Sequence, residues 1–74
     1  MRKPAIHTEP HLGQWANRRE GAKRVSRMFP TKTAAQAAGR SQAQRERTEH
    51  VIHDADGEIA SRNSYGNDPI RSRG

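Results

Sequence analysis

Positively charged side chains are the most densely clustered functional groups in this 74-residue sequence. Six basic residues gather between positions 18 and 32, interrupted by one acid, Glu20; they are Arg18, Arg19, Lys23, Arg24, Arg27 and Lys32. Two strands joined by a short turn would bring these side chains onto one β-ribbon, where they could contact phosphates without reading base sequence. The alternative is a solvated face that keeps a small protein in solution. We predict that these six residues bind nucleic acid or a ribonucleoprotein.

Trp15, the only tryptophan, has two interpretations. Its ring could be a platform on which a base stacks. A single Trp in a chain with few large apolar residues is more often the centre of the hydrophobic core. Only 4% of the residues are aromatic, so the interleaved aromatic residues of proteins that read single strands are missing. We therefore assign Trp15 to the core.

Four histidines raise the question of a metal site. His50 and His53 are three residues apart on a predicted strand, so their side chains should face opposite sides of the sheet. His7 and His11 have no fixed relation to each other. The sequence contains no cysteine, and Asp54 is the nearest additional ligand. We therefore predict no metal site, and nothing in the sequence indicates a cofactor.

No combination of residues indicates an enzyme. Ser61, Ser64, His53 and Asp54 lie near one another in the sequence, but Asp54 is explained by the turn that it begins. There is no Gly-rich phosphate loop, and a chain of this length has little room for a concave pocket. The sequence predicts a non-enzymatic protein without catalytic residues.

A β-hairpin is the clearest structural signal and organises the C-terminal part of the chain. Val51 and Ile52 are the only adjacent β-branched residues, and Asp56-Gly57 suits the tight turn that must precede Ile59. This pattern predicts two antiparallel strands, one on each side of the turn.

Three further strands are predicted upstream. The first covers residues 5–9, with Ile6 and Thr8 on one face and Pro10 ending it. A turn at Leu12-Gly13 leads to the second, residues 14–19. The third covers residues 23–29 and has no purely apolar face, so we expect it either at an edge of the sheet or in contact with a binding partner.

An Ala-rich helix is predicted from about residue 32 to about residue 46. Thr33, with Gln36 three residues later, has the form of a capping box, and Thr31 is the rival N-cap. The buried stripe would consist of small residues: Ala35, Ala38, Gly39 and Ala43. Because a glycine in mid-helix costs about 1 kcal/mol relative to alanine, we expect a bulky side chain to occupy the space next to Gly39.

These elements predict an α+β fold in the order β-β-β-α-β-β, with a small antiparallel sheet and one helix packed on one face. One domain would cover residues 1–74, with a mobile basic arm at 1–4 and a turn-rich tail at 64–74. The large apolar residues available for burial are Ile6, Leu12, Trp15, Val25, Met28, Phe29, Val51, Ile52, Ile59, Tyr65 and Ile70. So few large apolar residues can bury only a small apolar surface, and the domain should therefore be only marginally stable.

Several motifs together resemble a family of small bacterial proteins known as domain of unknown function 2188. They are His7-Thr8-x-Pro10-His11, Gly13-x-Trp15, the capped Ala-rich helix, a strand that ends at His53, Asp56-Gly57 and, most specifically, Ser64-Tyr65-Gly66-Asn67-Asp68-Pro69. The resemblance extends from about His7 to Pro69; it implies the fold and brings no activity. We interpret the last motif as a structural lock in which Tyr65 packs on the sheet, with a protein-recognition loop as the alternative.

Charge is unevenly distributed along the chain. Residues 1–47 carry eleven Lys and Arg against three Glu, a balance of +8, whereas residues 48–74 carry a balance of −2, for a total of +6. A polyanionic partner would meet the first part. No apolar run reaches the length of a signal peptide or a membrane span, so we expect a cytoplasmic protein without membrane contact.

We therefore predict a small basic protein that binds nucleic acid or a nucleic-acid machine. The alternative is a protein-interaction module, such as a phage or bacterial inhibitor or adaptor, that uses the open sheet face or the helix. A homodimer formed by pairing of edge strands is a further possibility.

Overall fold

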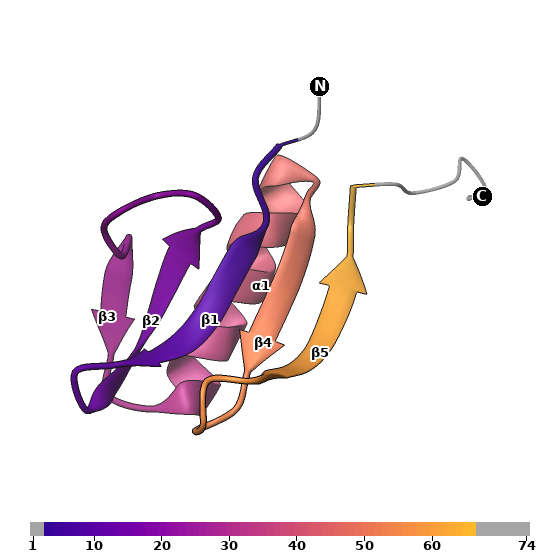
Figure 1. Ribbon diagram of the computed structural model, residues 1–74. Coiled ribbons are helices and arrows are strands. Elements are labelled where there is room, and N and C mark those ends of the chain that lie inside the picture. Colours follow the sequence, from indigo (N-terminus) through magenta and orange to yellow (C-terminus); the bar gives the residue numbers. More distant parts are fainter. Residues whose placement is uncertain (1–2, 67–74) are drawn as a thin grey trace.

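The computed structural model describes residues 3–66, and its architecture is α+β with one helix on one face of a sheet, as predicted. The sheet contains five strands: β1 (Ile6–His11), β2 (Gln14–Arg19), β3 (Arg27–Phe29), β4 (Glu49–His53) and β5 (Ile59–Ser64). The helix α1 (Lys32–Glu46) lies behind this sheet in the view of Figure 1. The other face of the sheet is uncovered within the described residues.

The sheet is mixed, which corrects the prediction that it is wholly antiparallel. Its strand order is β3-β2-β1-β4-β5, and β1 pairs with β4 in parallel, with Ile6 opposite His50 and Thr8 opposite Ile52. The reason lies in the helix. The helix α1 carries the chain from the last residue of β3 back to the end of the sheet at which β3 begins. Strand β4 therefore runs in the same direction as β3, and β3 runs in the same direction as β1.

Strand β1 extends through Pro10 to His11, although Pro10 was expected to end it. Its pairing with β4 ends at Thr8, so at Pro10 the strand has a partner only in β2. A locally unpaired side is where a sheet tolerates proline. The chain then reverses at Leu12-Gly13, as predicted, with both residues at positive φ (50° and 79°).

Strand β3 is shorter than predicted, because it begins only at Arg27. The N–H of Ala22 donates to the carbonyl of Arg19, and Gly21 has a φ of 86°, so the chain turns away from β2 immediately after Arg19. It pairs with β2 again only from Arg27 to Phe29. The predicted edge position of this strand is confirmed.

The helix has the predicted bounds, and the N-cap is Thr31 rather than Thr33. Thr31 has extended backbone angles, and its Oγ1 accepts a hydrogen bond from the N–H of Ala34 at 3.2 Å. Ala35, Gly39 and Ala43 are buried against the sheet, whereas Ala38, expected in the same stripe, is half-buried.

The core is small and partly polar. Its buried apolar residues are Ala5, Ile6, Ala16, Ala35, Ala43, Val51 and Ile52. Several large apolar residues that we expected to find there are elsewhere: Leu12 is 85% exposed in its turn, Ile59 is 49% exposed on β5, and Trp15 is only half-buried.

Polar side chains fill the space beneath the helix. A Cβ built at Gly39 would lie 2.7 Å from both His50 Nε2 and Thr8 Oγ1, and 2.9 Å from Asn17 Oδ1. The expectation that a bulky group occupies this space is confirmed, although the occupants are polar. The glycine therefore allows α1 to approach the sheet over a buried imidazole.

These side chains form one continuous set of hydrogen bonds. Thr8 Oγ1 donates to Asn17 Oδ1 at 2.6 Å, and Asn17 Nδ2 donates to the carbonyl of Ala35 at 3.0 Å. Since the hydroxyl proton of Thr8 is used in this way, His50 Nε2, at 2.8 Å, must be the donor to Thr8. The set connects β4, β1, β2 and α1 through the middle of the fold.

The two ends of the described chain meet at Thr48. Its hydroxyl donates to the carbonyl oxygens of Lys3 and Pro4, both at 3.0 Å, and its own carbonyl accepts from the N–H of Tyr65 at 3.2 Å. Residues 1–2 of the predicted arm and residues 67–74, which include Asn67-Asp68-Pro69, lie outside the described residues. From residue 3 to residue 66, no helix has the length and apolar character needed to cross a bilayer.

Candidate functional site

The structure separates the six basic residues that the sequence grouped together. Arg18 and Arg19 are consecutive on β2, so they point to opposite faces of the sheet. Arg18 Nε donates to Glu9 Oε2 at 2.8 Å, and Arg19 forms an ion pair with Glu46 on the helix. The expectation of one ribbon that carries all six cations is therefore wrong.

The Arg18–Glu9 pair is a two-bond contact on the uncovered face. In addition to the Nε bond, Arg18 Nη2 donates to Glu9 Oε1 at 3.3 Å. The hydrogen bond from Arg18 is the main reason that the pKa of Glu9 is lowered, and the same bond raises the pKa of Arg18. Both side chains are largely committed to each other, so Arg18 is a poor candidate for phosphate contact.

The other four cations have no carboxylate partner among residues 3–66. Lys23 and Arg24 lie in the loop between β2 and β3, Arg27 begins β3, and Lys32 begins α1. Because this loop and the start of α1 are at opposite ends of β3, the four residues follow that edge of the sheet (Figure 1). We call these four residues, with the rings of Trp15 and Phe29, the β3-edge strip.

Two aromatic rings lie within this strip. Trp15 and Phe29 are directly opposite each other on β2 and β3, and both are half-buried. Lys32 Nζ lies 5.3 Å from the Trp15 ring centroid, and Arg27 Cζ lies 5.2 Å from the Phe29 ring centroid. The assignment of Trp15 to the core is therefore wrong, because polar side chains and small residues fill the space beneath the helix.

The helix start adds to the positive potential of the strip. The first turn of α1 contains no acidic residue, and its N-terminus carries the positive end of the helix dipole. Thr31 satisfies one of the free N–H groups there. This end of the strip therefore favours a negatively charged ligand.

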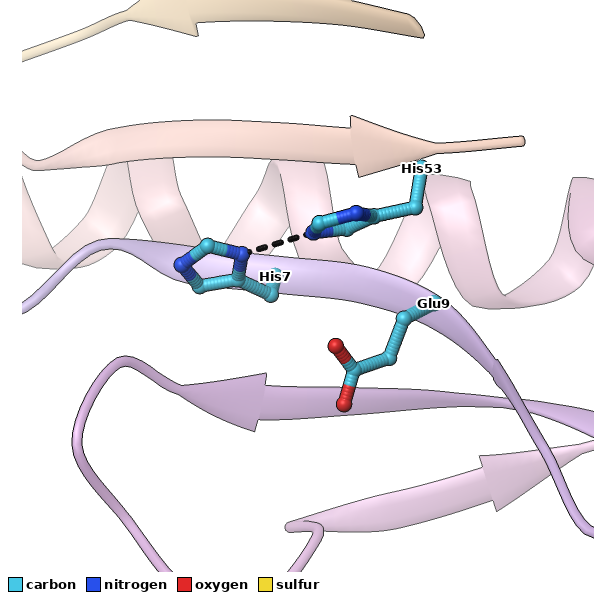
Figure 2. Close-up of side chains that lie close together, drawn as sticks. All are labelled: His7, Glu9 and His53. Atoms are coloured by element: carbon cyan, nitrogen blue, oxygen red, sulfur yellow. Dashed lines mark hydrogen bonds between the residues drawn. The ribbon is translucent and has the colours of Figure 1, made fainter. Parts of the chain in front are cut away.

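A second polar group lies on the uncovered face of the sheet. His7 and Glu9 project from β1, and His53 projects from the end of β4 toward them (Figure 2). His7 Nδ1 and His53 Nε2 are 2.8 Å apart. The two rings are inclined by 29°, with centroids 5.1 Å apart.

Each of these rings is held by a second hydrogen bond on its far side. His7 Nε2 lies 2.8 Å from Glu20 Oε1, and His53 Nδ1 lies 3.0 Å from the carbonyl oxygen of Gly57. A carbonyl and a carboxylate can only accept, so both outer nitrogens carry protons. The hydrogen bond with His7 is the main cause of the lowered pKa of Glu20.

Sequence reasoning missed this cluster. It placed His50 and His53 on opposite faces, which is correct, because His50 points to the helix and His53 to the uncovered face. The meeting of His7 with His53 depends on the parallel pairing of β1 with β4, which was not expected. The only local signal was the His7-x-Glu9 spacing, which places both side chains on one face of a strand.

Comparison with known proteins gives a family and nothing further. The model of a family described as an uncharacterized protein conserved in bacteria (DUF2188) matches residues 6–65. This span contains every described strand and the helix. No curated protein and no solved structure matches the chain.

Proposed function

The chain belongs to this family of uncharacterized bacterial proteins, and because the family assigns no activity, we propose a function from the chain's own surfaces. The protein is a small non-enzymatic binder of single-stranded nucleic acid, either free or within a larger complex in the cytoplasm. The observation that supports this proposal is the β3-edge strip. In this strip, four cations without a carboxylate partner among residues 3–66 lie along one sheet edge beside two half-buried aromatic rings.

Phosphate contact follows from the charges of the strip. Lys23 and Arg24 are exposed in their loop, and Arg27 is exposed on the edge strand. A phosphate that approaches these side chains does not have to break an ion pair within residues 3–66. Contacts of this kind position a strand without selecting its sequence.

Base stacking follows from the rings. Lys32 has a long flexible side chain, so its ammonium group can turn from the Trp15 ring to a phosphate while a base takes its place on the ring. Such stacking contributes about 1–3 kcal/mol per base and accepts every base. The strip therefore favours a single strand, whose bases are free to stack, over a duplex.

The test is fluorescence anisotropy of labelled oligothymidylate and oligouridylate at several salt concentrations. Four phosphate contacts predict that affinity falls as about the third power of salt concentration, because each contact on a single strand contributes a slope of about 0.7. Since Trp15 is the only Trp, quenching of its emission on binding reports stacking directly.

Charge-reversal variants give the control. The double variant R24E/R27E should bind about tenfold or more weakly. The matched variant R40E/R45E makes the same change in net charge on exposed positions of α1 and should retain most of the affinity. Equal losses in the two variants, or binding that is insensitive to salt, would contradict the assignment of the strip.

One observation favours the second candidate, a protein-interaction module. Strand β5 is the other edge of the sheet, and all six of its residues are exposed. An edge strand with exposed backbone groups can pair with a strand of another protein or of a second copy. A salt-insensitive complex that depends on β5 would favour this candidate, and sedimentation at two protein concentrations would reveal a homodimer.

A further inference from the structure

We propose that His7, Glu9 and His53 form a binding site for a divalent first-row transition-metal ion, of which Zn²⁺ is the natural probe. The site is on the uncovered face of the sheet, whereas Trp15 of the β3-edge strip points to the helix side. It therefore does not depend on the proposed nucleic-acid function.

The ligand set suits such an ion. Two imidazole nitrogens and one carboxylate oxygen are available, and these atoms all lie within 4.8 Å of one another. Imidazole suits Zn²⁺ and its neighbours in the first transition series, while a carboxylate supplies the negative charge that three neutral ligands would lack. Three protein ligands leave at least one position for water or another oxygen ligand.

The fold holds these ligands on rigid elements. His7 and Glu9 are two residues apart on the central strand β1, so both face the same side. His53 ends β4, where the pairing of β4 with β5 shifts between Ile52 and His53. Irregularities of this kind redirect side chains and are common beside functional sites.

A second hydrogen bond on each histidine ring turns its other nitrogen toward the proposed metal position. In metal sites, the nitrogen of histidine that does not bind the ion usually donates to a carboxylate or a backbone carbonyl. Here His7 donates from Nε2 to Glu20 at 2.8 Å, and His53 donates from Nδ1 to Gly57 at 3.0 Å. The remaining nitrogens, Nδ1 of His7 and Nε2 of His53, are therefore the ones that face each other.

The gap between the two facing nitrogens is close to what an ion requires. They are 2.8 Å apart. Two nitrogens bound to one tetrahedral Zn²⁺ at about 2.0–2.1 Å are about 3.3 Å apart. The observed separation is shorter than this, so a small outward rotation of the two rings would admit the ion between their nitrogens.

Glu9 can bind the ion without losing Arg18 entirely. Its Oε2 has the shorter bond to Arg18, at 2.8 Å, and its Oε1 has the longer one, at 3.3 Å. A carboxylate offers about four acceptor positions. Oε1 is therefore the oxygen that can turn to the ion while Oε2 keeps its bond to Arg18.

The test is titration of the chelator-treated protein with ZnCl₂ by isothermal calorimetry, with ¹H–¹⁵N NMR of the histidine rings on the same samples. We expect one ion per chain, with ring signals of His7 and His53 shifting together and those of buried His50 unchanged. Co²⁺ should give a visible absorption spectrum of a site with nitrogen and oxygen ligands.

Variants separate this site from adventitious binding by surface histidines. H7A and H53A should each weaken Zn²⁺ binding at least about tenfold, and E20A, which removes only an outer partner, should weaken it by about 10- to 100-fold. H11A is the matched control, because His11 is on the same strand and outside the cluster, and it should bind as the wild type does.

Folding of each variant is checked by circular dichroism. If H7A or H53A does not fold, E20A still tests the site, because Glu20 is 64% exposed and its removal should leave the fold intact. Absence of saturable one-to-one Zn²⁺ binding by the wild-type protein would overturn the proposal. So would equal losses in H11A and E20A, or NMR shifts confined to His11.

Discussion

Gly39 of α1 lies so close to His50 of β4 that a Cβ at position 39 would be 2.7 Å from the Nε2 atom of the imidazole. The contact explains why a helix of high intrinsic propensity contains a glycine at its centre. Close approach of the helix backbone encloses His50, Thr8 and Asn17 in a set of hydrogen bonds that replaces much of an apolar core.

Substitution G39A should destabilise the protein, against the usual trend. In an open helix this change stabilises by about 1 kcal/mol, but here the added methyl group overlaps buried atoms, and overpacking costs about 1–3 kcal/mol. Urea unfolding measures the difference, and A37G, at an exposed position of the same helix, should lose about 1 kcal/mol from propensity alone. A more stable G39A protein would show that the space is open.

Removal of the Thr8 hydroxyl should be more costly than removal of its methyl group. In T8V the Nε2–H of His50 loses its acceptor and Asn17 Oδ1 loses its donor, and each unpaired buried group costs about 1–3 kcal/mol. T8S keeps the hydroxyl and should cost about 1 kcal/mol or less. Unfolding free energies that do not distinguish the two variants would contradict the hydrogen-bond assignment.

Stability should fall as the solution becomes acidic, starting near the ordinary pKa of histidine. Burial, and secondarily the charge of Arg40, lowers the pKa of His50 in the folded protein. The unfolded chain takes up a proton as pH falls through about 6.5, whereas folded His50 stays neutral until lower pH. The unfolded state therefore binds more protons in this interval, and the free energy of unfolding decreases with decreasing pH.

Urea unfolding at about pH 7.5 and about pH 5.5 checks the sign of this change. The variant H50Q, which keeps a donor for Thr8 but cannot titrate, should show a flatter dependence. NMR of the His50 ring in the folded protein should detect no protonation at the usual pH. A normal titration of this ring would exclude the buried neutral form.

The N-cap assignment can be tested by two single substitutions. T31A removes the oxygen that accepts from Ala34 and should cost about 1 kcal/mol. T33A is inside the first turn at an exposed position and should change stability little, or increase it slightly through higher helix propensity. A T33A protein that is less stable than T31A would show that the helix is capped by Thr33 and not by Thr31.

Short-range features were predictable from the sequence. The helix bounds follow from the alanine content after Pro30, the hairpin follows from Asp56-Gly57 between β-branched segments, and the first turn follows from Leu12-Gly13. The occupied space next to Gly39 could also be inferred, because a glycine in the middle of a helix is unfavourable unless a close contact requires it. Propensity, capping and turn geometry all act within a few neighbouring residues, so the local sequence contains the information.

The arrangement of both candidate surfaces was decided only by the tertiary structure. The side chains of Arg18 and Arg19 point to opposite faces because a strand alternates its side chains, and each pairs with a nearby carboxylate, Glu9 or Glu46. Trp15 reaches the surface because polar side chains fill the space beneath the helix. His7 meets His53, 46 residues later, because the helix returns the chain so that β4 runs parallel to β1. The direction and position of that pairing depend on packing of the whole chain, which no short stretch of residues encodes.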